Sequence, residues 1–441
     1  MSPRPIGIDL FAGAGGMSLG FEQAGFDVVA AVEIDPVHCA THKYNFPHCA
    51  VLPRSVVGLT GAEIRIAAGL GSRRVDVVFG GAPCQGFSMI GQRALDDPRN
   101  ALVRDFLRIV AELDASYFVF ENVKGLTLGQ HRKFLEEFEE LACSMGYDFA
   151  KSWQVLDAAH YAVPQHRERL FLFGAKHPRS LPKYPDKLTR AADGRGRAPA
   201  SLPIGPTAEA ALSDLPDADR FEELLSSDEV RVTNWGIASP YASELRCLTN
   251  DAWHFGYVRK WNTSSLTSSA RTGHTEISKR RFIETEGGKT EPISRFYKLR
   301  RDGLSNTLRA GTDGARGAFT SPRPIHYEHS RCVTVREMAR LHGYPDWFRF
   351  HETKWHGARQ IGNSVPPPLA RAVAGQVIIA LGTTRQLPVE CIETGDPSLL
   401  RLTVSEAAAY FGISAPIMRR DKKSGATKRR QWEIEESRIA I

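Results

Sequence analysis

Residues 6–16 read IGIDLFAGAGG, and this stretch decides the fold. Its apolar start predicts a short buried strand over 6–10, and the glycine-rich turn behind it opens a helix. Helix-like segments separate this strand from four further apolar segments of strand length: 28–32, 75–79, 117–120 and 170–174. The alternation predicts an α/β fold with a doubly wound, mostly parallel sheet across residues 5–175.

The turn after the first predicted strand lies where open α/β sheets bind nucleotide-like cofactors. The dinucleotide pattern Gly-x-Gly-x-x-Gly is not satisfied, because Ser18 occupies its last glycine position. Asp9 before the turn repels phosphate and attracts an ammonium group, while Glu33 at the end of the second strand suits two ribose hydroxyls. A cofactor with a ribose and an amino acid but no phosphate meets both conditions. The pattern therefore predicts S-adenosylmethionine.

Chemically active side chains stand at the ends of three successive predicted strands. Cys84 stands in the turn GGAPCQGFS, residues 80–88, where an exposed thiol faces a cleft. Glu121 follows the next strand, and Arg167 and Arg169 precede the last one. Taken singly, each has a structural interpretation: a buried inert cysteine, a capping carboxylate and surface salt bridges. Together they predict covalent attack on a pyrimidine ring.

These motifs resemble the DNA (cytosine-5)-methyltransferases of the bacterial modification type. The resemblance covers residues 5–175 and 331–381 and rests on DLFAGAGG (9–16), GAPCQGFS (81–88), ENV (121–123), VPQHRER (163–169), LHGYP (341–345) and GNSVP (362–366). It implies that Cys84 is the nucleophile, that Glu121 contacts the base, and that Arg167 and Arg169 support the site. It also implies a cofactor pocket lined by Phe11, Gly13, Gly15, Gly16, Glu33, Ile34, Pro83, Asn363 and Ser364.

The chain departs from the family pattern at one position. The family usually carries an acidic residue near the end of the third strand that contacts the adenine amino group, and Ser55 or a neighbour stands there instead. This departure leaves that contact open.

The domain organisation follows from composition and from the resemblance. Residues 176–206 are rich in Pro, Gly and Arg and indicate a boundary. A short helix is predicted over 335–342, and a second one runs from the prolines at 366–368 to Leu381. We expect four parts: a catalytic and cofactor-binding domain (1–178), a target-recognition domain (179–328), a return segment that completes the first domain (329–385) and a helix-turn-helix appendage (400–441).

Charge is distributed unevenly along the chain. The net charge is +7, and residues 259–328 hold 14 Lys and Arg against 7 Asp and Glu. A solvated surface is the simplest interpretation of such a stretch, but the flanking motifs favour contact with DNA. The candidate contacts are Arg271, Lys279, Arg280, Arg281, Arg300, Arg301 and Arg309. We expect double-stranded DNA as the partner, and a cognate restriction endonuclease as a functional one.

The chain from residue 400 onward has its own pattern. Thr403 to Glu406 form a capping-box sequence, a turn follows at 411–414, and residues 419–430 carry 7 Lys and Arg against 1 Asp. The span resembles the helix-turn-helix of excisionase-like proteins. A helical hairpin packed on the enzyme is an equally good interpretation.

The mechanism expected from the resemblance needs a cytosine outside the duplex, because no side chain reaches a stacked ring. A protonated Glu121 then neutralises the ring, which predicts a raised pKa for this carboxyl. Residues 88–100 are expected to close on the extruded base, with Arg93 and Arg99 holding phosphates.

Other classes are disfavoured by composition. The seven cysteines are odd in number and lack a Cys-x-x-Cys pair, which indicates a reducing compartment. The cluster of His38, Cys39, His42, His48 and Cys49 fits no common zinc spacing, so no metal is expected. No signal peptide or membrane span is evident, and we expect a cytoplasmic monomer acting at the bacterial nucleoid.

Two alternatives remain open. A tRNA methyltransferase family shares nearly all of these motifs, although its recognition lobe is compact. A DNA-binding regulator without catalysis should have lost Cys84, Glu121 or the glycine turn, and none is lost.

Overall fold

The computed structural model describes residues 4–83, 101–127, 132–150, 152–312 and 320–415. Its main sheet has eight strands in the order β3-β2-β1-β4-β5-β8-β6, with β7 paired to β8. Their bounds are β1 Ile6–Leu10, β2 Asp27–Glu33, β3 Ala50–Pro53, β4 Val77–Gly80, β5 Tyr117–Val123, β6 Tyr147–Phe149, β7 Gln154–Asp157 and β8 Glu168–Lys176. Strands β1 to β5 are parallel, and β8 runs antiparallel to β5, β6 and β7. The predicted mostly parallel sheet is confirmed.

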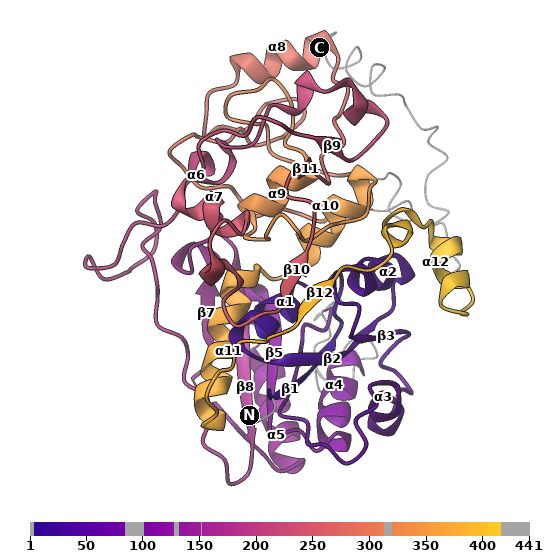
Figure 1. The fold of residues 1–441 in the computed structure, drawn as a ribbon. Coiled ribbons are helices and arrows are strands. Elements are labelled where there is room, and N and C mark those ends of the chain that lie inside the picture. The colour runs from indigo at the N-terminus through magenta and orange to yellow at the C-terminus, as the bar shows by residue number, and fades with distance from the viewer. Residues whose placement is uncertain (1–3, 84–100, 128–131, 151, 313–319, 416–441) are drawn as a thin grey trace, which may run out of the picture.

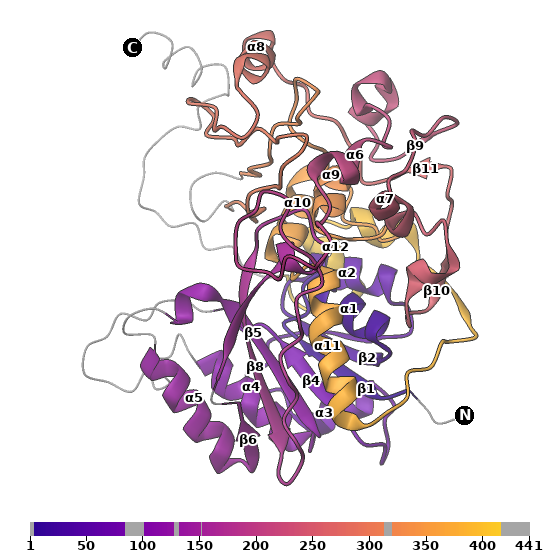
Figure 2. The same cartoon turned by 90° about the vertical axis from the view of Figure 1, so that its left-hand side faces the viewer.

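Helices cover both faces of this sheet (Figures 1 and 2). The side chains of a strand alternate between faces, so Phe118 and Phe120 face one helical layer and Tyr117 and Val119 the other. The first layer contains α3 (Gly61–Ala67), α4 (Ala101–Glu112) and α5 (Arg132–Ser144), and the second contains α1 (Gly16–Ala24) and α11 (Pro367–Leu381). The doubly wound arrangement follows from this alternation.

Helix α11 returns from far along the chain to complete the core. It packs so closely on α1 that a Cβ at Gly20 would lie 2.4 Å from the Cβ of Ala370. Its bounds confirm the helix predicted from the prolines at 366–368. The helical stretch Lys354–Leu381 has the length and composition of a membrane span, but 61% of its apolar window is buried inside the protein, as in a core helix.

Between β8 and α11 the chain forms what we call the upper lobe, residues 187–312 and 320–363, which stands above the sheet in Figure 1. Its elements are short: α6 Ala208–Leu212, α7 Pro240–Leu245, α8 Glu276–Glu284, α9 Val335–Leu341, α10 Lys354–Asn363, β9 Val230–Arg231, β10 Val258–Lys260 and β11 Ser265–Leu266. The capping box of Thr334 and Glu337 starts α9, which confirms the helix predicted there. Helix α10 was not predicted.

The C-terminal part of the described chain wraps around the catalytic body. Strand β12 (Cys391–Glu393) pairs with β10, and α12 (Val404–Tyr410) starts at the predicted capping box of Thr403 and Glu406. Leu399, Leu400 and Phe411 around it contact apolar residues of α2 (Pro36–Asn45). This contact fits the packed-helix interpretation, while the second helix of the predicted helix-turn-helix lies outside the described residues.

Candidate active site

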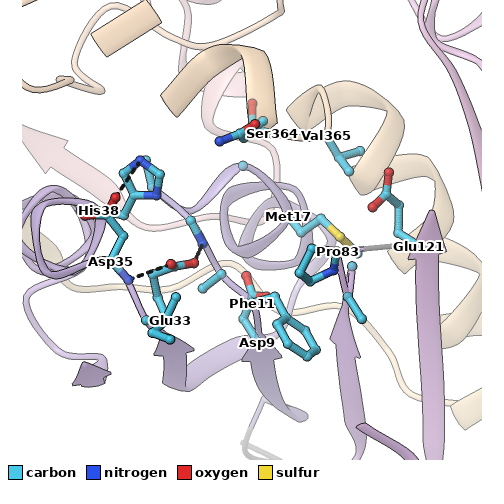
Figure 3. A pocket seen from close by; sticks show the side chains of 18 of the residues that line it. Asp9, Phe11, Met17, Glu33, Asp35, His38, Pro83, Glu121, Ser364 and Val365 are labelled. Carbon is cyan, nitrogen blue, oxygen red and sulfur yellow. Dashed lines mark hydrogen bonds and ion pairs between the residues drawn. The ribbon is translucent and has the colours of Figure 1, made fainter. Parts of the chain in front are cut away.

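A cavity of about 600 Å³ opens at the carboxyl ends of the parallel strands. Its wall combines the residues that follow β1, β2, β3, β4 and β5 with the connection between α10 and α11. Figure 3 shows side chains from these segments pointing toward one another across it. Parallel strands deliver their carboxyl ends to one edge, so the cavity lies where the sequence predicted the chemistry.

The glycine turn after β1 forms the floor of this cavity. Phe11, Gly13 and Gly16 line it, and Gly13 has a φ of 55° with open space where a Cβ would point. A Cβ at Gly16 would lie 2.6 Å from the Tyr344 hydroxyl, so only glycine fits under the return segment. Gly15 was predicted to line the cavity, but it is not among the lining residues. A Cβ added at Gly15 would lie 2.5 Å from the Phe46 ring.

Glu33 is fixed at the end of β2 by two backbone amides. Its carboxylate accepts hydrogen bonds from Gly13 N at 2.8 Å and from Asp35 N at 2.9 Å (Figure 3). Each oxygen keeps a lone pair for a hydroxyl group in the cavity. Ile34 beside it is 64% exposed and also lines the wall.

Asp9 differs from its predicted state. Its carboxyl is 1% exposed and accepts a hydrogen bond from the Ser18 hydroxyl at 2.6 Å. Burial raises the pKa of Asp9 to about 8, so the neutral form dominates at pH 7. Asp9 also lines the cavity, so a bound ammonium group would favour its ionised form, and the predicted attraction stays a prediction.

Glu121 stands on β5 at the side of the cavity next to Pro83 (Figure 3). Arg169 Nε contacts its Oε1 at 2.8 Å, and both side chains are 13% exposed. Burial raises the pKa of Glu121, while Arg169 and Arg167 oppose the rise. The direction agrees with the predicted one. A Cβ at Gly81 would lie 2.2 Å from Glu121 Oε2, so the turn after β4 needs glycine there.

Arg167 lies behind the cavity wall rather than in it. Its guanidinium is buried and donates to Leu308 O at 3.0 Å and to Gly362 O at 2.7 Å. Burial lowers the pKa of Arg167 to about 9. The residue therefore joins β8, the upper lobe and α10, and contacts no open space where a base would bind.

Pro83, the residue before the proposed nucleophile, is the last described residue of its segment. Pro83 lines the cavity, and Ala82 O accepts a hydrogen bond from Asn122 Nδ2 at 2.9 Å. Cys84 itself, with Arg93, Arg99 and the predicted closing loop, lies outside the described residues.

The return segment closes the cavity from the far side. Asn363 and Ser364 line it as predicted, and Ser364 Oγ lies 3.1 Å from His342 Nε2. Ser55 also lines it, just after β3, where the family pattern has an acidic residue. Sequence reasoning missed five further polar residues of the wall: Asp35, His38, Arg54, Arg359 and Gln360. Asp35 had a signal, because it precedes Pro36 as a helix cap.

The candidate DNA-contacting cations of the upper lobe separate into two groups. Five of the seven already have protein partners: Arg271 with Phe221 O, Lys279 with Glu276, Arg281 with Glu291, Arg300 with Asp302, and Arg301 with Glu209 and Glu328. Arg280 and Arg309 have no hydrogen bond or ion pair among the described residues.

Comparison with known proteins gives consistent matches. The family model described as C-5 cytosine-specific DNA methylase matches residues 7–379. The chain is 55% identical to the type II methyltransferase M.XorII of Xanthomonas oryzae over 95% of each chain. It is 30% identical to M1.HphI of Haemophilus parahaemolyticus, with 84% of this chain and 86% of the relative covered.

Solved structures share the fold. A DNA modification methyltransferase, so described, from an E. coli prophage matches with a TM-score of 0.66 and 30% identity, over 86% of this chain and 100% of that one. The Dnmt2 methyltransferase of S. pombe matches with a TM-score of 0.51 and 17% identity over 86% of this chain and 100% of that one, which shows the fold alone.

Proposed function

Because the chain belongs to the C-5 cytosine-specific DNA methylase family, and is thus a DNA (cytosine-5)-methyltransferase, we propose how its site performs that reaction. S-adenosylmethionine binds in the cavity, Cys84 attacks an extruded cytosine, and Glu121 protonates it. One observation carries the proposal: the Glu121 carboxyl, held by Arg169, faces the same cavity as the amide-fixed Glu33.

The cavity residues fit the proposed cofactor. A ribose carries two adjacent hydroxyl donors, and the Glu33 carboxylate presents two oxygens oriented by Gly13 N and Asp35 N. The Gly13 position is open, so an amino-acid moiety approaches the backbone there without a clash. The bound cofactor supplies a methyl group activated by a positively charged sulfur.

The protein groups activate the base. Carbon 5 of cytosine is a weak nucleophile until the Cys84 thiolate bonds to carbon 6 and shifts the double-bond electrons toward it. The raised pKa of Glu121 favours its protonated form. This carboxyl donates its proton to N3, which neutralises the charge that builds on the ring. Arg169 keeps this carboxyl in place at 2.8 Å. Loss of the carbon-5 proton after methylation expels the thiolate.

The substrate is a cytosine swung out of double-stranded DNA, since these groups reach no ring inside a duplex. The part of the upper lobe that falls within the target-recognition domain predicted over 179–328 contacts the surrounding DNA sequence. The names of the relatives, which describe type II methyltransferases, support a role as the modification partner of a restriction endonuclease. We also propose that the enzyme acts as a monomer.

Transfer of a labelled methyl group tests the proposal. We expect the protein to label duplex DNA but not tRNA, and the labelled base to be 5-methylcytosine on hydrolysis. Cys84→Ser should abolish turnover, while Cys143→Ser, which changes an exposed thiol on α5, should leave it unchanged. Labelling of tRNA instead of duplex DNA would favour the alternative substrate, and full activity of Cys84→Ser would refute the proposed chemistry.

A further inference from the structure

The upper lobe carries a second pocket, of about 280 Å³, among residues 290–297, 306–309 and 322–324. Three arginines line it, Arg295, Arg309 and Arg323, together with two aromatic rings. Among its described lining residues none is acidic. Cations beside aromatic rings, without carboxylates, suit a nucleic acid.

The three arginines differ in exposure and in whether their side chains already have hydrogen-bond partners. Arg323 is 7% exposed and donates to Val333 O at 2.8 Å and to Thr272 Oγ1 at 2.7 Å, so it is part of the lobe's structure. Arg295 and Arg309 are exposed, and neither side chain has a hydrogen bond or ion pair within the described chain. These two guanidiniums are available to a ligand.

Arg309 follows a segment that is fixed to the catalytic body. Five hydrogen bonds join residues 305–308 to residues 164–167: Ser305 N to Pro164 O at 2.9 Å, His166 N to Ser305 O at 3.2 Å, Thr307 Oγ1 to His166 O at 2.8 Å, Leu308 N to Gln165 Oε1 at 3.0 Å, and Arg167 Nη1 to Leu308 O at 3.0 Å. Leu308 is buried while Arg309 is exposed. The backbone that carries the Arg309 side chain is therefore held rigidly.

The same backbone adjoins the cofactor cavity. A Cβ at Gly362 would lie 2.4 Å from the carbonyl carbon of Arg309, and Gly362 lines the cavity wall. The backbone that carries the Arg309 guanidinium thus lies against the wall of the cofactor cavity. Contacts that distinguish bases need such fixed donors.

We propose that Arg309 recognises a guanine beside the target cytosine through two parallel hydrogen bonds to O6 and N7. Guanine is the base that presents two acceptors on its major-groove edge, and a guanidinium offers two donors in a fixed fork. Arg295, the other exposed guanidinium without a partner among the described residues, suits contact with a phosphate, where charge matters more than orientation. This inference rests on the proposed function and identifies one of its specificity determinants.

The test compares arginine variants on altered duplexes. Bisulfite sequencing of methylated DNA first gives the wild-type target, and kcat/KM is then measured on duplexes with each target base pair replaced in turn. Arg309→Ala should lose about 10- to 100-fold on the wild-type target and lose discrimination at one G·C pair. Arg309→Lys should keep the charge yet fail to restore discrimination.

Two controls use other exposed cations. Arg295→Ala should lower kcat/KM by a similar factor on all duplexes and reduce the salt dependence of binding. Arg73→Ala removes an exposed cation that precedes β4, at the edge of the sheet opposite the cavity, and should behave like the wild type. Melting temperatures of all variants should match, because these side chains are exposed.

Two results would overturn the inference. If Arg309→Ala lowers activity equally on every duplex, Arg309 contacts a phosphate and the assignment is wrong. If Arg309→Lys restores discrimination, a single donor suffices and recognition through two parallel hydrogen bonds is wrong. A wild-type protein that methylates no duplex refutes the proposed function itself, so the two failures are distinct.

Discussion

Around the sheet the large fully buried side chains include aromatic rings such as Phe106 on α4 and Phe118 on β5, whereas in the upper lobe they include Arg331, Arg336 and Arg340, each at most 1% exposed. A buried aromatic ring stabilises the fold because its apolar surface is removed from water, whichever apolar residues it packs against. A buried guanidinium contributes only while its carboxylate and carbonyl partners are all in place. The two regions should therefore respond differently to substitution and to acid.

Two of these buried arginines each have one partner nearby in the chain and one from a distant segment. Arg340 contacts Asp346 at 2.6 Å and the distant Asp214, which is fully buried, at 3.1 Å. Arg331 pairs with Glu337 at 2.8 Å and with the distant Asp217 at 3.2 Å. These pairs tie the lobe's short elements to α9, where extended sheet ladders are missing among the described residues.

The largest expected effect comes from breaking this network. Arg340→Met leaves Asp214 and Asp346 buried without a cation, and we expect it to lower the free energy of unfolding by about 3–5 kcal/mol. Urea denaturation followed by tryptophan fluorescence measures the loss. Arg301→Ala, which removes an exposed cation paired with Glu209 and Glu328, should change stability by less than about 1 kcal/mol. Equal losses of unfolding free energy in the two variants would contradict the expected difference between buried and exposed arginines.

Acid should weaken the lobe next. Arg331 lowers the pKa of the buried Glu337 to about 2, below its ordinary 4.5. A depressed pKa stabilises the fold above pH 4.5, and that contribution, about 3 kcal/mol, is lost as the pH falls toward 2. Glu337→Gln should be less stable at pH 7 and show a shallower decline in acid. A parallel decline would mean that other carboxyls account for acid sensitivity.

Asp9, under the glycine turn of the sheet, should give stability the opposite pH dependence to Glu337. Burial raises its pKa to about 8, so its contribution is complete below pH 3.8 and is lost as the pH rises through 8. Asp9→Asn keeps a neutral group in the same place. We expect this variant to gain stability over the wild type between pH 6 and about 8, measured by thermal unfolding across that range.

A smaller effect is expected on cofactor affinity. Glu33→Gln retains an acceptor but loses charge and one oxygen, which should raise the Kd of S-adenosylmethionine by about 10- to 100-fold, measured by titration calorimetry. Glu63→Gln changes an exposed carboxyl of the α3 capping box and serves as the matched control. An unchanged Kd in Glu33→Gln would remove this residue from the cofactor site.

The sequence predicted the sheet region far better than the lobe. Apolar runs such as residues 6–10 and 117–120 mark buried strands by composition alone. The glycine turn and Glu121 then follow from strand ends meeting at one edge. Short pieces such as β3, β6 and β7 lack a run long enough to detect.

In the lobe the sequence shows each charge but not its partner. Arg340 and Asp214 are 126 residues apart, and no local pattern joins them. The basic stretch at 259–328 pointed to DNA as a whole, yet most of its named cations turned out to be paired within the protein. Gly15 and Arg167 were likewise assigned to the site from motifs. In the structure Gly15 lies beside the Phe46 ring, and Arg167 donates to the Gly362 carbonyl.

Trapping of the reaction intermediate tests the central claim most directly. The protein is incubated with S-adenosylmethionine and a duplex that carries 5-fluorocytosine at the target, and the product is digested and analysed by mass spectrometry. Fluorine cannot leave as the proton does, so the account predicts a stable adduct between the ring and Cys84, with one added methyl group. An intact duplex with no adduct, or an adduct on another residue, would contradict it.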